Sequence, residues 1–368
     1  MRLGILGGGQ LAWMLAQAAE PLGVSVAVLD PSPDAAAGRI AEHVAAAYDD
    51  LAGLDAVSAG ADVVTYEFEN IPAAAVARLA ALGVTVLPLP ASLTTTQDRA
   101  REKELMRGLG IHVAPYALID APADAAAALT QVGAPGILKT RRLGYDGKGQ
   151  VRVATAADLP AAIRELGGTD LIYEGLVAFT RELSVVVARG TDGSLVAYPP
   201  VENEHRDGIL SCTVAPAPAL PPAQAEAAQA IGFAVAEALG HIGVLCVELF
   251  DTPDGIVANE IAPRVHNSGH WSIEGAVTSQ FANHVRGVLG LPLGDPSARG
   301  VAAMVNIVGT EPELAALLAI SGASVHTYGK APRPGRKLGH VTLVAESSAA
   351  LAAPLAQARA LCAAAWDA

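Results

Sequence analysis

Residues 258–270, ANEIAPRVHNSGH, gather the side chains best suited to chemistry in a chain otherwise rich in alanine, valine and leucine. Within eleven positions lie Glu260, Arg264, His266, Asn267, Ser268 and His270. This set is compatible with a metal site, an anion clamp or a solvated loop. Zinc is disfavoured, because His266 and His270 have i,i+4 spacing but Pro263 and Gly269 indicate a loop instead of a helix.

Two acids in the preceding run, IGVLCVELFDTPDGIVANE, are predicted to face each other. The turn residues PDG separate two apolar strands, expected at Ile242–Phe250 and Ile256–Ile261, so the run predicts an antiparallel hairpin. If the turn centres on Asp254, Glu248 and Glu260 lie opposite each other. Facing carboxylates repel, and a bridging Mg²⁺ with oxygen ligands would relieve that repulsion. A shared proton, or a register that separates the acids, is the alternative.

A lysine and a glycine-rich loop upstream are suited to phosphate binding. Lys139 ends a short apolar run, so its ammonium stands at the end of a buried strand. The loop GYDGKGQ at 144–150 lacks side chains at three of its first six positions, which lets backbone amides approach phosphates. It is not a Walker A loop, and a plain hairpin turn is the alternative. A strand expected at Leu171–Glu174 then ends in an acid, beside which backbone groups suit an adenine and a ribose.

The N-terminal stretch alternates short apolar runs with a helical one, which predicts a parallel sheet with crossover helices. Strands are expected at Leu3–Leu6, Val24–Leu29, Val63–Tyr66 and Val84–Leu87, and a helix at Gln10–Glu20. Gly7, Gly9 and Ala12 fit the dinucleotide pattern G-x-G-x-x-G/A, and Asp30 stands where a ribose-binding acid would. A tight turn into a close-packed helix explains the same glycines without a dinucleotide.

The remaining elements divide the chain into three predicted domains. Prolines after the fourth strand place a boundary near residue 91, and a new β-rich stretch begins at 301, which gives domains 1–91, 92–300 and 301–368. Helices are expected at Leu93–Arg107 and Ala223–Leu239, and the alanine-rich tail predicts a closing helix.

Composition restricts the class of protein. With 52% hydrophobic and 17% charged residues, the chain of 368 residues is expected to be a folded α/β protein and not a disordered one. Its net charge of −13 disfavours nucleic acid and anionic membranes as partners. The three cysteines are too scattered for a disulfide framework, and neither a signal peptide nor an 18-residue apolar run is present. We therefore expect a cytoplasmic protein.

The order of Lys103, Lys139, the glycine loop, Glu174, Glu182 and the paired acids resembles that of the ATP-grasp superfamily. More narrowly, GGGQLAWML, GYDGKGQ, DGIL, NEIAPRVHNSGHW and RPGRKLGH resemble the N5-carboxyaminoimidazole ribonucleotide synthetase family, over nearly the whole chain. The resemblance implies an α/β and α+β fold: a Rossmann-like pre-ATP-grasp domain at 1–91, an ATP-grasp domain with two α+β lobes at about 92–177 and 178–300, and a small β-rich C-terminal domain at 301–368. It also implies a homodimer.

The implied reaction joins bicarbonate to 5-aminoimidazole ribonucleotide (AIR) through carboxyphosphate, with hydrolysis of ATP. Glu248 and Glu260 would hold Mg²⁺, with Mn²⁺ as an alternative ion. The implied ATP contacts are Arg99, Lys103, Lys139, Gly144, Tyr145, Asp146, Gly147, Lys148, Gly149, Gln150, Glu174, Gly175, Leu176, Val177, Glu182, His205, Asn259 and Glu260. The implied catalytic residues are Arg264, His266, Asn267, Lys337, Asp146 and Lys148.

AIR is expected between the first two domains. Glu67 would meet its amine or ribose, Tyr145 its imidazole, and the amides at the start of the first helix its phosphate. The full set expected to contact AIR is Gly8, Gly9, Gln10, Glu67, Glu69, Tyr145, Arg336 and Lys337.

Ala262 departs from the wider superfamily, in which many members carry a metal-binding Asn at that place; the narrower family shares the departure. The full metal ligand set therefore stays open. A formate-dependent glycinamide ribonucleotide transformylase would share the nucleotide half, but HNSGH favours bicarbonate and AIR. A Rossmann-type NAD(P)-binding protein is the second alternative.

Overall fold

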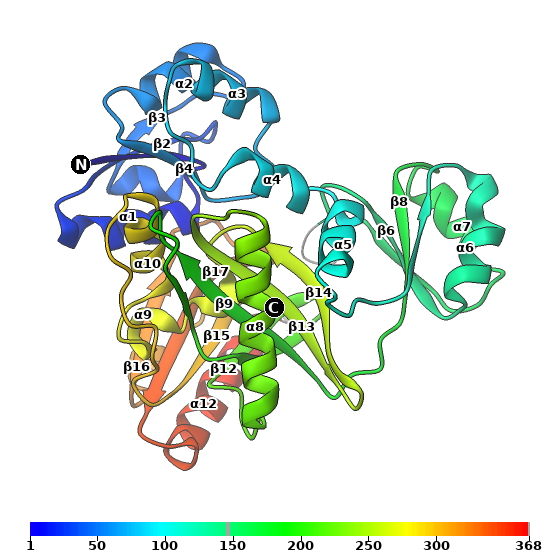
Figure 1. The fold of residues 1–368 in the computed structure, drawn as a ribbon. Helices are drawn as coiled ribbons and strands as arrows, with labels where there is room; N and C mark the ends of the chain where they lie inside the picture. The colour runs from blue at the N-terminus through cyan, green and yellow to red at the C-terminus, as the bar shows by residue number, and fades with distance from the viewer. Residues whose placement is uncertain (145–147, 367–368) are drawn as a thin grey trace.

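The computed structural model describes residues 1–144 and 148–366 (Figure 1). Its first sheet is parallel, in the order β3-β2-β1-β4, because short buried apolar runs alternate with crossover helices. The strands are β1 (Arg2–Leu6), β2 (Ser25–Leu29), β3 (Glu42–Val44) and β4 (Val63–Tyr66). The helices are α1 (Gln10–Ala19), α2 (Leu51–Ser58) and α3 (Ala73–Ala81).

The strand predicted at Val84–Leu87 is wrong. Only one bridge forms there, between Val86 and Val64, because the chain leaves β4 after the bond from the Leu87 amide to the Val64 carbonyl.

The second sheet is antiparallel, in the order β5-β8-β6-β7, and lies well away from the first, at the right of Figure 1. Its strands are β5 (Tyr116–Ile119), β6 (Gly136–Thr140), β7 (Gln150–Val153) and β8 (Leu171–Gly175). Helices α6 (Ala125–Val132) and α7 (Leu159–Glu165) cover one face. We call this unit, residues 116–175, the small lobe.

The connection between these sheets corrects a second prediction. The single helix expected at Leu93–Arg107 is two helices, α4 (Pro90–Thr96) and α5 (Arg99–Gly108). Asp98 separates them in an extended conformation, and its carboxylate accepts the amide of Ala100 at 3.0 Å. An aspartate that caps a new helix in this way competes with continuation of the old one.

The third sheet has nine strands and forms the body of the molecule. Its main path is β14-β13-β9-β11-β12-β15-β17-β16, with β10 paired to β9. The strands are β9 (Arg181–Arg189), β10 (Leu195–Ala197), β11 (Val201–Arg206), β12 (Ile209–Ala215), β13 (Gly243–Thr252), β14 (Gly255–Ala262), β15 (Val301–Gly309), β16 (Ala323–Thr327) and β17 (Arg333–Ala345). The C-terminal strands therefore extend the sheet that carries the predicted hairpin.

Helices cover the large sheet and attach the first sheet to it. They are α8 (Pro222–Ala238), α9 (Ser272–Gly275), α10 (Gln280–Val288), α11 (Leu314–Leu318) and α12 (Ser348–Trp366). Buried side chains of α1 and α10 belong to one apolar core, so the first sheet packs directly above the large one (Figure 1). Within the described residues, no helix is long and apolar enough to cross a membrane.

Candidate active site

The predicted hairpin is confirmed as β13 and β14, with Glu248 directly opposite Glu260. The turn contains two residues, Pro253 and Asp254, so regular pairing would place Glu248 opposite Asn259. A β-bulge at Asn259 shifts the register by one residue and brings the two acids together. Lys103, buried on α5, donates from Nζ to the Asn259 carbonyl at 2.8 Å and so holds the bulge.

Each of the facing carboxylates has its own cation. His266 Nε2 lies 3.1 Å from Glu248 Oε1, and Arg99 Nη2 lies 3.3 Å from Glu260 Oε2. Although burial alone would raise it, the His266 contact lowers the pKa of Glu248 to about 2. Burial alone would lower the pKa of His266, but Cys246 and Glu248 raise it to about 10. Both shifts favour the ionised forms of this pair.

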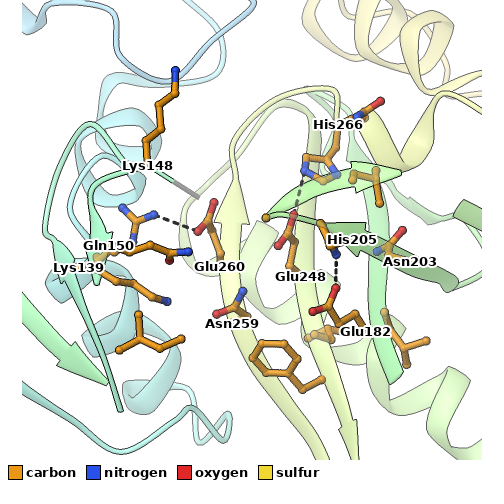
Figure 2. Close-up of a pocket in the computed structure, with 18 of the residues that line it drawn as sticks. Lys139, Lys148, Gln150, Glu182, Asn203, His205, Glu248, Asn259, Glu260 and His266 are labelled. Carbon is orange, nitrogen blue, oxygen red and sulfur yellow. Dashed lines mark hydrogen bonds and ion pairs between the residues drawn. The ribbon is translucent and has the colours of Figure 1, made fainter. Parts of the chain in front are cut away.

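A cavity of about 320 Å³ opens between these acids and the small lobe. In Figure 2, Lys139 and Gln150 extend from the small-lobe side toward the opening beside Glu260, whereas Lys148 points upward, away from Glu260. The predicted residues that line it are Glu69, Arg99, Lys139, Lys148, Gln150, Glu182, His205, Glu248, Asn259, Glu260, Arg264, His266, Asn267 and Lys337. His205 also contacts Glu182, as Figure 2 shows.

Several lining residues of this cavity were missed from the sequence: Ile137, Leu183, Asn203, Gly208, Leu210, Leu249 and Phe250. A period-two reading of the hairpin would have found Phe250, which follows Glu248 by two positions. Asn203 carries no such local signal, because only the pairing of β11 with β9 places it opposite Glu182. The cavity thus has apolar and polar walls.

Some predicted nucleotide contacts do not line the cavity: Lys103, Gly144, Gly149, Glu174, Gly175, Leu176 and Val177. Glu174 is buried between two ammonium groups, 3.1 Å from Lys139 and 3.4 Å from Lys103. Burial opposes ionisation, but the two lysines hold the pKa of Glu174 below its usual value. Its Oε1 has no hydrogen-bond partner among the described residues. The contacts predicted for Tyr145, Asp146 and Gly147 fall outside those residues.

A second, larger cavity of about 690 Å³ lies between the first sheet and the start of β17. The predicted residues that line it are Gln10, Glu67, Glu69, Lys148, Arg264, Asn267, Arg336 and Lys337. Lys330 and Arg333 also line it and were missed. The cavity therefore gathers six cationic side chains in a protein of net charge −13. An anionic ligand suits this cavity.

The glycine loop at the start of α1 does not offer the free amides that we expected for a phosphate. The Glu67 carboxylate accepts the amides of Gly9 at 2.6 Å and Ala12 at 2.8 Å. Asp30 accepts the amide of Gly8 at 2.8 Å. The loop is thus already capped by acids of its own sheet, which favour the positive end of a helix. Use of Asp30 in this way also disfavours the dinucleotide interpretation.

Five residues line both cavities and define what we call the seam: Glu69, Lys148, Arg264, Asn267 and Lys337. Arg264 pairs through Nε with Glu69 Oε2. Both polar side-chain atoms of Asn267 are buried without a hydrogen-bond partner among the described residues. Buried amides are rarely left unpaired, so this amide indicates a ligand at the seam.

The geometry does not include a complete metal site. Among residues 1–144 and 148–366, no group of three or more His, Cys, Asp or Glu side chains is arranged to hold an ion. Glu248 and Glu260 supply the two carboxylates of a hard oxygen site, and Ala262 adds no ligand. The two acids therefore fit Mg²⁺ only if phosphate or water oxygens complete its shell.

Comparison with known proteins covers the whole chain. The ATP-grasp domain family matches residues 104–281, the ribonucleotide synthetase preATP-grasp domain family residues 1–97, and the phosphoribosylaminoimidazole carboxylase C-terminal domain family residues 302–354. The N5-carboxyaminoimidazole ribonucleotide synthase of Pseudomonas aeruginosa is 46% identical over 361 residues, which cover 98% of this chain and 99% of the relative. The chain belongs to the N5-carboxyaminoimidazole ribonucleotide synthase family.

Solved structures of this synthase family share the fold. The N5-carboxyaminoimidazole ribonucleotide synthetase from Thermus thermophilus superposes with a TM-score of 0.94 at 47% identity, over 98% of each chain. The synthase from Aspergillus clavatus, solved in complex with ADP and AIR, gives a TM-score of 0.89 at 32% identity, over 97% of this chain and 98% of that one. The predicted fold class and family are confirmed.

Proposed function

We propose that this chain carboxylates AIR with ATP and bicarbonate, giving N5-carboxyaminoimidazole ribonucleotide, ADP and phosphate in purine biosynthesis. The observation that carries the proposal is the seam. A nucleotide-sized cavity with facing acids and a cationic cavity meet at five shared residues, where a small anion can contact the ligands of both.

ATP occupies the first cavity. Lys139 and Lys148 neutralise its phosphates, while Phe250 and Leu210 offer apolar surface to the base. Glu248 and Glu260 would hold Mg²⁺ or Mn²⁺, and the ion would supply positive charge beside the transferring phosphoryl group. The protein's part in this step is to position and to neutralise, because phosphoryl transfer requires little covalent chemistry from the enzyme.

AIR occupies the second cavity with its phosphate toward Lys330, Arg333 and Arg336, and its amine toward Glu67 and Glu69. This orientation replaces the phosphate position that we expected at Gly8 and Gly9, where the amides are already taken. It directs the amine to the seam, because Glu69 lines both cavities.

Bicarbonate binds at the seam between Arg264, Asn267 and Lys337, with the His266 imidazolium beside them. A bicarbonate oxygen forms a bond to the γ-phosphorus as the bond to the β–γ bridging oxygen breaks, and ADP leaves with that electron pair. By one route, carboxyphosphate releases CO₂ as its hydroxyl proton passes to the departing phosphate, and the AIR amine attacks the CO₂ carbon. By the other, the amine attacks carboxyphosphate itself, and the C–O bond to the phosphoryl oxygen breaks so that phosphate leaves. In both routes the nitrogen then loses one proton to phosphate.

The test is an ADP-release assay that crosses AIR or glycinamide ribonucleotide with bicarbonate or formate, with mass detection of the product. We expect turnover only with AIR and bicarbonate, and a product heavier than AIR by one carboxyl group. Turnover with formate and glycinamide ribonucleotide, without any product from AIR, would overturn the proposal. We further propose a cytoplasmic homodimer, which fractionation and sedimentation would test.

A further inference from the structure

Among the described residues of the first sheet and its connections, Glu69 is the one that lines both cavities. Among the described residues that line the nucleotide cavity, it alone comes from residues 1–91, and it lines the cationic cavity as well. Its backbone is fixed, because Gln97 Nε2 donates to the carbonyls of Glu69 at 2.6 Å and Ile71 at 3.0 Å. The Glu69 side chain therefore extends to the seam from a fixed segment of backbone.

The Glu69 carboxylate engages the residue proposed to hold bicarbonate. Its Oε2 accepts Arg264 Nε, and the two side chains are only 23% and 18% exposed, so water screens the pair weakly. Arg264 also donates from Nη1 to the Val265 carbonyl at 3.1 Å. In this state, the guanidinium is neutralised by a carboxylate before any anionic substrate arrives.

We propose that Glu69 couples the two cavities: without AIR it neutralises Arg264 and weakens bicarbonate binding, and AIR frees Arg264 by drawing the carboxylate to its amine. The inference rests on the proposed function, because it requires AIR and bicarbonate at the positions given above. In this scheme Glu69 contacts the AIR amine directly and acts on bicarbonate through Arg264. By linkage, AIR and bicarbonate must then tighten each other's binding by the same factor.

This coupling would protect ATP from hydrolysis that yields no product. Carboxyphosphate formed without AIR decomposes to CO₂ and inorganic phosphate, since its hydroxyl proton passes to phosphate as the C–O bond to the phosphoryl oxygen breaks. Each such event consumes one ATP without product. A carboxylate that keeps Arg264 neutral until AIR arrives makes this loss rare.

The test measures phosphate release with saturating ATP and bicarbonate, with and without AIR, together with the ratio of phosphate released to N5-carboxyaminoimidazole ribonucleotide formed. For Glu69→Gln, we expect AIR-independent hydrolysis to rise about tenfold, within the range typical of coupling between sites. The ratio should rise above one, and Glu69→Asp should restore part of the suppression. A variant that is merely misfolded would lower hydrolysis and leave the ratio unchanged, which would count against the proposal.

Asp55→Asn is the matched control, because it removes an arginine-paired carboxylate of the same domain from an exposed site, 2.9 Å from Arg78. It should change neither rate nor ratio. Adding Arg264→Ala to Glu69→Gln should abolish the extra hydrolysis. If Arg264→Ala raises the KM for bicarbonate but Glu69→Gln leaves the ratio at one, the coupling fails and the proposed function stands. If Arg264→Ala leaves that KM unchanged, the proposed bicarbonate site fails and the coupling fails with it.

Discussion

Glu248 faces Glu260 across the β13–β14 hairpin because one residue, Asn259, bulges out of the ladder between them. Without that bulge, Glu260 would lie opposite Val247 and point to the other face of the sheet. The shared face of the two acids is therefore a property of the backbone register, and Lys103 stabilises that register through the Asn259 carbonyl.

Glu260→Gln should lower kcat for ATP-dependent carboxylation by roughly 100-fold or more, a loss typical when one electrostatic contact to a transition state is removed. The amide retains the shape of the side chain but removes one of the two charges that hold the cation. Steady-state kinetics over a range of Mg²⁺ concentrations would measure the effect, with exposed Glu226→Gln on α8 as the control. Near-normal turnover would refute the role of the facing acids.

Arg264→Ala should raise the KM for bicarbonate roughly 10- to 150-fold, the equivalent of a charge-assisted hydrogen bond worth about 1.5–3 kcal/mol. Affinity for ATP should change little, because Arg264 lies at the seam and Arg99 and Lys139 remain in the nucleotide cavity. Calorimetric titration with a non-hydrolysable ATP analogue would measure the affinity. Loss of ATP affinity, with bicarbonate saturation unaltered, would assign Arg264 to the nucleotide site.

Lys330 should make AIR binding sensitive to alkaline pH. Burial lowers the pKa of its ammonium to about 8, and the group donates to Gln10 Oε1 beside the Tyr328 ring. The side chain is charged below that pKa and loses its charge as pH rises through it, so attraction for the AIR phosphate is lost above about pH 8. kcat/KM for AIR should fall there, and Lys330→Arg should move the fall to higher pH. An identical profile for both proteins would contradict the assignment.

Lys103→Met should destabilise the fold, because it leaves the buried Glu174 carboxylate with Lys139 as its remaining ion-pair partner and releases the Asn259 carbonyl. Breaking one side of a buried ion pair costs about 3–5 kcal/mol. Thermal and urea unfolding would measure the loss, and Arg101→Met, exposed on the same helix, is the matched control. Equal stability of the two variants would exclude a structural role and favour the phosphate contact expected from the sequence.

Local patterns predicted the elements that depend on local chemistry. Turn residues between apolar runs predicted the hairpin, and the pairing of Glu248 with Glu260 was right even though the assumed turn centre was not. The bulge at Asn259 offset an error of one residue in the loop length. No sequence rule anticipated that bulge, because the hydrogen bond that holds it comes from α5.

Residues brought in by long-range packing were harder to predict. Lys330 contacts Gln10, which is 320 positions away in the sequence, so no local sequence pattern near either residue predicts the contact. The amides of Gly8 and Gly9 were misjudged for the same reason. From the sequence alone, a helix N-terminus with free amides cannot be distinguished from one that is already capped by acids. Only the order of strands in the sheet places Asp30 and Glu67 beside the start of α1.

The continuity of the large sheet determines which part of this molecule can move during turnover. Hydrogen-bonded strands join Glu248 on β13 to Lys337 on β17 through β9, β11, β12 and β15. The two acids proposed to bind the metal and the Lys337 side chain at the seam therefore stand on one continuous sheet. The small lobe has its own sheet, so we expect closure over ATP to move Lys139 toward Glu260 and to leave the large sheet unchanged.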